Sequence, residues 1–130
     1  MANPNIVSVS SIYGECCGWA LTNTLTTTLF TVTASKLIKI NRIVCANVDG
    51  SSAADLNLYI TTAIQTSLGG TVAGGATDIY LAKTIAVPAD SSLVVSDTPI
   101  YLRENDILKG GASAASDLEL FITYEVLDDA

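Results

Sequence analysis

Apolar and polar side chains alternate near the end of the chain, and this alternation constrains the fold more than any other feature. Every second residue from Leu118 to Val126 is Leu, Ile, Tyr or Val, and Glu, Phe or Thr fills the positions between. Successive side chains of a strand point to opposite faces, so a period of two predicts a strand with one buried face. Asp55–Thr61 shows the same period. Because no segment repeats apolar residues at helical spacing, the sequence predicts an all-β protein.

Further strand-sized segments lie between turn signals along the chain. They are Ile6–Ser10, Trp19–Leu21, Thr28–Thr33, Leu37–Val48, Ile79–Val87, Leu93–Val95 and Ile100–Leu102. About eight antiparallel strands at a spacing of roughly 8 to 15 residues are typical of a β-sandwich or jelly roll. No linker divides the chain, so we expect residues 1–130 to form a single domain of this kind.

Three local patterns refine this prediction. The short polar turn Ala34-Ser35-Lys36 predicts a hairpin between the strands on either side of it. The inward positions then change phase around Asn41-Arg42, which predicts a β-bulge there, since one extra residue exchanges the two faces of a strand. The third pattern lies in a later strand, where apolar residues occupy alternate positions and predict its inward face. These residues are Ile79, Leu81, Ile85 and Val87.

The charge of the chain excludes two classes of partner. Thirteen acidic and six basic residues give a net charge of −7 at neutral pH. Such a protein repels phosphate backbones and anionic membrane surfaces, so we expect no nucleic-acid or membrane partner. The apolar runs also fall well short of the roughly 20 residues that span a bilayer. The first residues lack the basic and apolar regions of a signal peptide, which predicts synthesis in a cytosol.

Candidates for catalysis and metal binding are few. The chain has no histidine, which removes Ser-His-Asp and Cys-His arrangements. Three cysteines, Cys16, Cys17 and Cys45, do not suffice for a zinc site, and we expect small buried or half-buried thiols. The carboxylate pairs Glu104/Asp106 and Asp128/Asp129 could serve as acid and base or as calcium ligands. Acidic residues at strand ends more often solubilise a β domain, so we expect no enzyme, cofactor or metal.

Three regions are candidates for contacts with other proteins. The first is an N-terminal arm, residues 1–10, in which Asn3, Pro4, Ile6 and Val7 could add a strand to a neighbour's sheet. The second is the tip around Asp49–Ala54, which begins with the turn at Asp49 and Gly50. The third is a flexible glycine-rich loop, residues 65–78, whose glycines are Gly69, Gly70, Gly74 and Gly75. A carbohydrate-binding adhesion module is a further hypothesis, and it predicts an exposed aromatic platform at Trp19 or Tyr59.

Several segments resemble a known protein family. They are the opening Met-Ala-Asn-Pro-Asn-Ile-Val, Lys36–Gly50, Ile85–Leu93 with its Val-Pro-Ala-Asp turn, and Tyr101–Asp106. Together they resemble the small β-sandwich virion structural proteins of tailed bacteriophages, most closely those of contractile-tailed marine cyanophages. The sequence departs from that pattern at Cys16-Cys17 and in the glycine-rich loop.

This resemblance implies a function without catalysis. The chain would be made in the host cytoplasm and incorporated in the virion, as a capsid decoration or cement protein that binds the major capsid protein. It implies a homo-oligomer, and the analogy with decoration proteins suggests a trimer. The alternative within the same class is a neck, tail, baseplate or fibre component.

Overall fold

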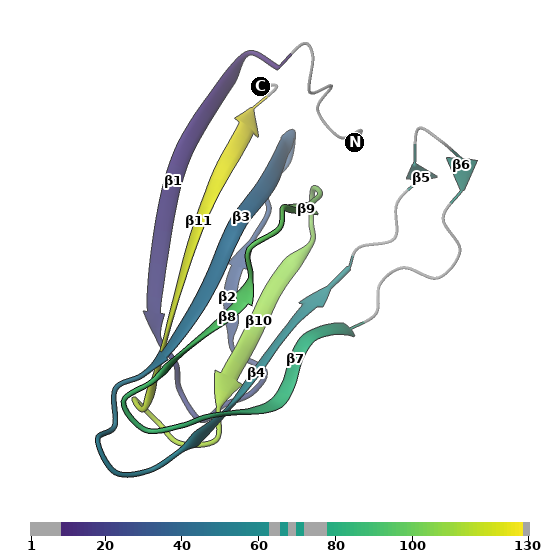
Figure 1. Cartoon of the computed structure of the whole chain (residues 1–130). Helices are drawn as coiled ribbons and strands as arrows, with labels where there is room; N and C mark the ends of the chain where they lie inside the picture. Colours follow the sequence, from purple (N-terminus) through teal and green to yellow (C-terminus); the bar gives the residue numbers. More distant parts are fainter. Residues whose placement is uncertain (1–8, 63–65, 68–69, 72–77, 129–130) are drawn as a thin grey trace.

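Two antiparallel β-sheets pack face to face in the computed structural model, which describes residues 9–62, 66–67, 70–71 and 78–128 (Figure 1). The described residues contain no helix, and thus no helix that could cross a membrane. The prediction of an all-β sandwich is confirmed.

Each sheet draws its strands from distant parts of the sequence. The five-stranded sheet contains β1 (Ser11–Ala20), β11 (Leu118–Asp128), β3 (Lys36–Asn47), β8 (Ser92–Ser96) and β9 (Ile100–Leu102), the last two both pairing with β3. The four-stranded sheet has the order β2 (Thr28–Thr31), β10 (Ile107–Ala112), β4 (Ala54–Thr61) and β7 (Asp78–Val87). A separate pair joins β5 (Thr66–Ser67) to β6 (Gly70–Thr71).

The pairings are nested along the chain. β1 pairs with β11, β2 with β10, β3 with β8 and β9, and β4 with β7. If β8 and β9 are taken as two halves of one interrupted strand, eight strands form four nested antiparallel pairs divided between two sheets. This is the jelly-roll arrangement that the strand spacing predicted.

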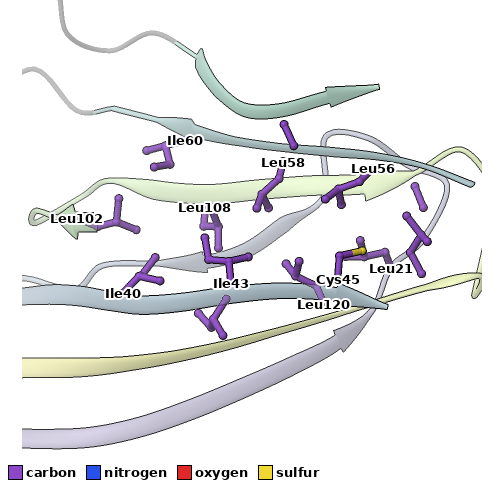
Figure 2. Close-up of a cluster of buried hydrophobic side chains, with 14 of the residues drawn as sticks. Leu21, Ile40, Ile43, Cys45, Leu56, Leu58, Ile60, Leu102, Leu108 and Leu120 are labelled. Carbon is purple, nitrogen blue, oxygen red and sulfur yellow. The ribbon is translucent and has the colours of Figure 1, made fainter. Parts of the chain in front are cut away.

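The core lies between the two sheets and is almost entirely aliphatic (Figure 2). Ile40, Ile43 and Cys45 of β3 are fully buried, and Leu56 and Leu58 of β4 face them from the other sheet. Burying a side chain of this size contributes about 1.5–3 kcal/mol, so this interface supplies the main stabilisation of the fold.

A β-bulge interrupts β3 where the sequence predicts it. Thr123 of β11 pairs with Arg42 and Tyr124 pairs with Ile40, which leaves Asn41 as the extra residue. Ile40 and Ile43 are three positions apart, so in a regular strand they would point to opposite faces. The bulge turns both of them toward the core. This prediction is confirmed.

The predicted hairpin around Ala34–Lys36 is wrong. β2 and β3 lie in different sheets, and the residues between them cross from one sheet to the other. The amide of Val32 donates to the carbonyl of Asp106 at 2.9 Å, which leads the chain away from β3 instead of back along it. A short polar segment suits a hairpin or a crossing equally well, and packing decides between them.

The predicted inward face of β7 is also wrong in part. Val87 and Ala82 are buried, whereas Ile79 and Ile85 are 52% and 42% exposed. The register against β4 shifts twice between Ile85 and Tyr80, and the first extra residue brings Ala82 to the inward side. Ile79 and Ile85 pair with the buried Ile60 and Leu56, so they lie on the inward side as predicted, but they stay exposed because β7 is an edge strand.

β1 is longer than the sequence suggested. The predicted strand Trp19–Leu21 covers only the end of a ten-residue strand. Gly14, Cys16, Cys17 and Gly18 obscure the pattern, because they are too small to show an apolar alternation. The predicted strand Ile6–Ser10 lies almost wholly outside the described residues.

Candidate protein-contact site

The outer face of the five-stranded sheet carries a row of apolar residues. Gly18 pairs with Phe121, Phe121 with Val44, and Val44 with Val94, so these four point to the same side of the sheet. The surface formed by Val44, Val94 and Phe121 is called here the outer apolar face. Ile12 and Tyr101 are exposed on the same side of the sheet, but Lys39, Arg42 and Glu125 separate them from this face. Phe121 is 48% exposed and Val94 is 45% exposed. Exposed apolar patches on soluble proteins commonly mark interaction sites.

A shallow depression surrounds Phe121 within this face. Its lining residues are Gly18, Trp19, Ala20, Val44, Ala46, Glu119, Leu120 and Phe121. Gly18 keeps the space beside the ring open, since a Cβ there would lie 3.3 Å from Phe121 Cδ1. Only Glu119 is charged, so the depression suits an apolar side chain of another protein better than it suits catalysis.

A groove follows the inner side of β1, between the two sheets. Its lining residues are Tyr13, Glu15, Phe30, Thr31, Thr33, Lys36, Ile38, Tyr124 and Val126. The Tyr124 hydroxyl donates to Glu15 Oε2 at 3.0 Å. Burial, and then this hydrogen bond and the charge of Glu15, raise the pKa of Tyr124 to about 12. The tyrosine therefore stays neutral and holds the carboxylate over β11.

Three of the four carboxylates considered for catalysis or calcium binding have structural partners, and the fourth, Asp129, lies outside the described residues. Glu104 Oε2 accepts the amide of Ser35 at 2.8 Å, and Asp106 Oδ2 accepts the amide of Arg103 at 2.8 Å. Both side chains are buried, so the expectation that they solubilise strand ends is wrong: they hold loops in place. Asp128 forms an ion pair with Lys36 at 2.7 Å. Within the described part of the chain, no three His, Cys, Asp or Glu side chains gather to hold a metal ion.

The three cysteines differ in exposure. Cys45 is fully buried, and burial raises the pKa of its thiol to about 11. Cys17 is half-buried, whereas Cys16 is exposed on β1. The expectation of buried or half-buried thiols is therefore wrong for Cys16, because β1 turns its side chain to the outer face of the sheet.

The predicted aromatic platform is not formed by the residues expected. Tyr59 is only 4% exposed, and its ring lies 4.9 Å from that of Tyr80. Trp19 is half-buried and stacks on Phe30 at 6.3 Å, and Phe30 stacks on Tyr124 at 6.2 Å. These rings serve packing between strands.

Most of the predicted contact residues belong to segments that the structure does not describe. Outside the described residues lie Asn3, Pro4, Ile6, Val7, Gly69, Gly74 and Gly75. Gly70 begins β6, so the segment 65–78 includes a short strand pair.

The turn at Asp49 and Gly50 lies beside a second turn at one end of the sandwich. The carbonyl of Asp49 accepts the amide of Asp90 at 3.1 Å. The Asp49 carboxylate accepts hydrogen bonds from the amide and the hydroxyl of Ser51, both at 3.0 Å.

Sequence reasoning missed the outer apolar face, although Phe121 in the polar phase of an alternating strand was a visible signal.

Comparison with known proteins finds similarity only among solved structures. No protein-family model and no curated protein matches the chain. One similar structure is described as "Bacillus endospore appendages form a novel family of disulfide-linked pili": identity is 17%, the TM-score 0.46, and coverage 92% of this chain and 88% of that one. Another is the VP2 subviral particle of infectious bursal disease virus, with 17% identity, a TM-score of 0.41, and coverage of 92% and 33%. This chain thus spans about a third of the VP2 chain. At such identities and scores, these similarities carry no argument about function.

Proposed function

We propose that this chain is a structural protein of a bacteriophage virion, a capsid decoration protein that binds the head surface and stabilises it through protein contacts. The observation that carries the proposal is the outer apolar face, where the large apolar side chains of Phe121 and Val94 are exposed. Exposed aromatic and aliphatic residues with few charges among them are typical of the centre of a protein interface.

The surroundings of this face support the same function. Lys39, Arg42, Glu119 and Glu125 lie on the same side of the sheet, and Lys39 and Glu125 form an ion pair at 3.6 Å. Charged residues around an apolar centre resemble the polar rim of an interface. Gly18, Ala20 and Ala46 lie beside Phe121 and bring no polar side chain that a partner would have to desolvate.

The assignment to a phage particle rests on the sequence resemblance. Three of the four resembling segments correspond to β3 with the turn after it, to the end of β7 with its Pro88 turn, and to β9 with the loop of buried carboxylates, whereas residues 1–7 lie outside the described residues. They are framework elements, so the resemblance concerns the body of the sandwich. The major capsid protein as partner and a homo-oligomer belong to this proposal.

Reconstitution on capsids tests it. Particles that lack the protein are mixed with the purified chain, and binding and thermal stability of the particle are measured. Wild-type protein binds and raises the unfolding temperature of the capsid. Phe121→Ser weakens binding about tenfold or more, because apolar area at the contact is lost. Ile79→Ser, an exposed position on the other sheet, binds as wild type. If the wild-type chain does not bind these capsids, the proposal is refuted.

Two further measurements separate the alternatives. A copy number comparable with that of the major capsid protein supports the head, whereas a copy number limited to one ring of subunits assigns the chain to the neck, tail or baseplate. A glycan-array signal without capsid binding would favour an adhesion module instead.

A further inference from the structure

β1 lies at the margin of the five-stranded sheet and is the most regular of its edges (Figure 1). All ten of its residues pair with β11, from Ser11 with Asp128 to Ala20 with Glu119, and no register shift occurs. Among the strands that the structure describes, none pairs with its other side. Alternate residues of an edge strand direct their N–H and C=O groups outward, where another strand can bind them.

Features that usually protect an edge are missing from β1. It contains no proline, lysine or arginine, and its one charged residue is Glu15. The Glu15 carboxylate accepts the hydroxyl of Tyr124 on β11, so it is held over the neighbouring strand and away from the open edge. A ten-residue edge of this kind is a template for strand addition.

The other sheet edges are poorer templates. β2, β7 and β8 each shift register against the strand beside them. β2 is only four residues long, and Pro99 lies in the break between β8 and β9. Of the edges described, only another β1 matches β1 in length and regularity.

We propose that β1 pairs antiparallel with β1 of a second copy of this chain, which joins the two five-stranded sheets into one continuous sheet. The contact is isologous and closes at two copies. It specifies the homo-oligomer of the proposed function, and it is tested on the free chain, so its failure is distinguishable from a failure of capsid binding. The trimer expected by analogy would need a different, head-to-tail contact.

A register centred on Cys16 satisfies the pairing best. It places Gly14 opposite the second copy's Gly18, and Glu15 opposite the second copy's Cys17. A register centred on Glu15 would oppose two carboxylates, which is destabilising. Within the chain, a Cβ on Gly14 would meet nothing within 4 Å, so packing does not require glycine there. Close approach of another backbone accounts for a glycine in a strand.

Sedimentation equilibrium of the reduced full-length chain tests the pairing. The expected mass is about twice 13.5 kDa. Cys16→Lys opposes two positive charges at the centre of the contact and yields the monomer. Thr123→Lys is the matched control, because Thr123 pairs with Cys16 on the same face but one strand in from the edge. It remains dimeric, and thermal unfolding checks that both variants fold.

Three results of this experiment would overturn the proposal. The first is a wild-type chain that is monomeric at its highest soluble concentration. The second is equal dissociation by Thr123→Lys, which would assign the association to the outer apolar face. The third is loss of the dimer when residues 1–8 are deleted, which would assign the edge to the N-terminal arm.

Thiol oxidation supplies an independent readout. Diamide accepts two electrons and two protons from a pair of thiols, so that one S–S bond forms and diamide becomes the hydrazine. We expect a covalent dimer in wild type and in Cys17→Ser but not in Cys16→Ser. Cys45 is buried and stays out of the reaction. Equal rates of cross-linking in folded and urea-unfolded protein would indicate random collision and contradict the pairing.

Discussion

β1 and β7 are both ten-residue strands at the edge of a sheet, yet they differ in regularity. β1 follows its neighbour without a register shift, whereas β7 shifts twice against β4. Thr84 of β7 takes a left-handed backbone conformation with φ of 53°, and its amide donates to Asn57 Oδ1 at 3.2 Å. This fold therefore protects one edge by bending it and leaves the other straight.

The physical difference lies in the backbone and not in hydrophobicity. Both strands expose large apolar side chains, such as Ile12 on β1 and Ile85 on β7. A bulge leaves an unpaired residue and increases the local twist, so a straight strand cannot align with it. Lys83 adds a charge to β7, and its Nζ lies 5.1 Å from the centre of the Tyr80 ring. We therefore expect association through β1 and not through β7.

Two glycine substitutions give the largest contrast. Gly110→Ala places a Cβ against the carbonyl oxygen of Asn57 and 3.1 Å from Leu58 Cα, on the strand that supports β7. Because backbone atoms cannot give way easily, we expect a loss of about 3 kcal/mol in the free energy of unfolding. Gly14→Ala on β1 meets no atom of its own chain and changes the free energy of unfolding of the monomer by less than about 0.5 kcal/mol. Urea unfolding measures both, and equal losses would contradict this account of the two edges.

Asn57→Ala removes the acceptor that holds the bulge of β7. The amide of Thr84 loses its side-chain partner, so we expect a loss of about 1–2 kcal/mol in stability. Hydrogen exchange at the Thr84 amide should become faster, whereas exchange along β1 stays unchanged. Asn41→Ala serves as control because Asn41 is only half-buried, whereas Asn57 is buried, and we expect it to change stability by under about 0.5 kcal/mol. Unchanged exchange at Thr84 would show that the side chain does not hold the bulge.

Thr84→Gly should stabilise the protein. A β-branched residue in the left-handed region is strained by about 1–2 kcal/mol, and glycine adopts this conformation freely. After the greater flexibility of glycine in the unfolded chain is allowed for, we expect a gain of about 0.5–1 kcal/mol. Thr123→Gly, at a position of β11 outside the left-handed region, should instead lower stability by a similar amount. A loss at both positions would show that Thr84 is not strained.

The smallest expected effect is on the alkaline limit of stability. The pKa of Tyr124 is about 12 in the folded protein against 10.0 for an ordinary tyrosine, so the folded state retains its proton where the unfolded state loses it. Stability therefore falls as pH rises from about 10 to about 12. Tyr124→Phe should flatten this decrease. Burial, and then the charge of Asp78, also raise the pKa of Tyr59, so Tyr59→Phe acts in the same direction beside β7. Urea unfolding at a series of pH values measures both, and an unchanged slope in Tyr124→Phe would contradict the assignment.

Sequence reasoning succeeded where one strand decides the outcome. The alternation from Leu118 to Val126 identified β11, and the phase change near Asn41 identified the bulge in β3. It failed where a second strand decides: the register of β7 depends on β4, and β2 joins β10 instead of β3.

The candidate site divides in the same way. Phe121 in the polar phase of β11 was readable from the sequence. Its neighbours Gly18, Val44 and Val94 come from three other strands, so the row that they form could not be read from the sequence. The sequence did not reveal the edge formed by β1 either, because the small residues of this strand show little alternation of apolar and polar side chains.

The sequence by itself determined that the chain forms strands. The alternation of apolar and polar residues and the scarcity of helical spacing are local properties that can be read within one segment. It also excluded the catalytic arrangements that require histidine, because the chain has none. Only the tertiary structure decided which strands become edges, which face of a sheet stays uncovered, and that Glu104 and Asp106 are buried. These outcomes depend on contacts between residues far apart in the chain, and such contacts form only when the two sheets pack together.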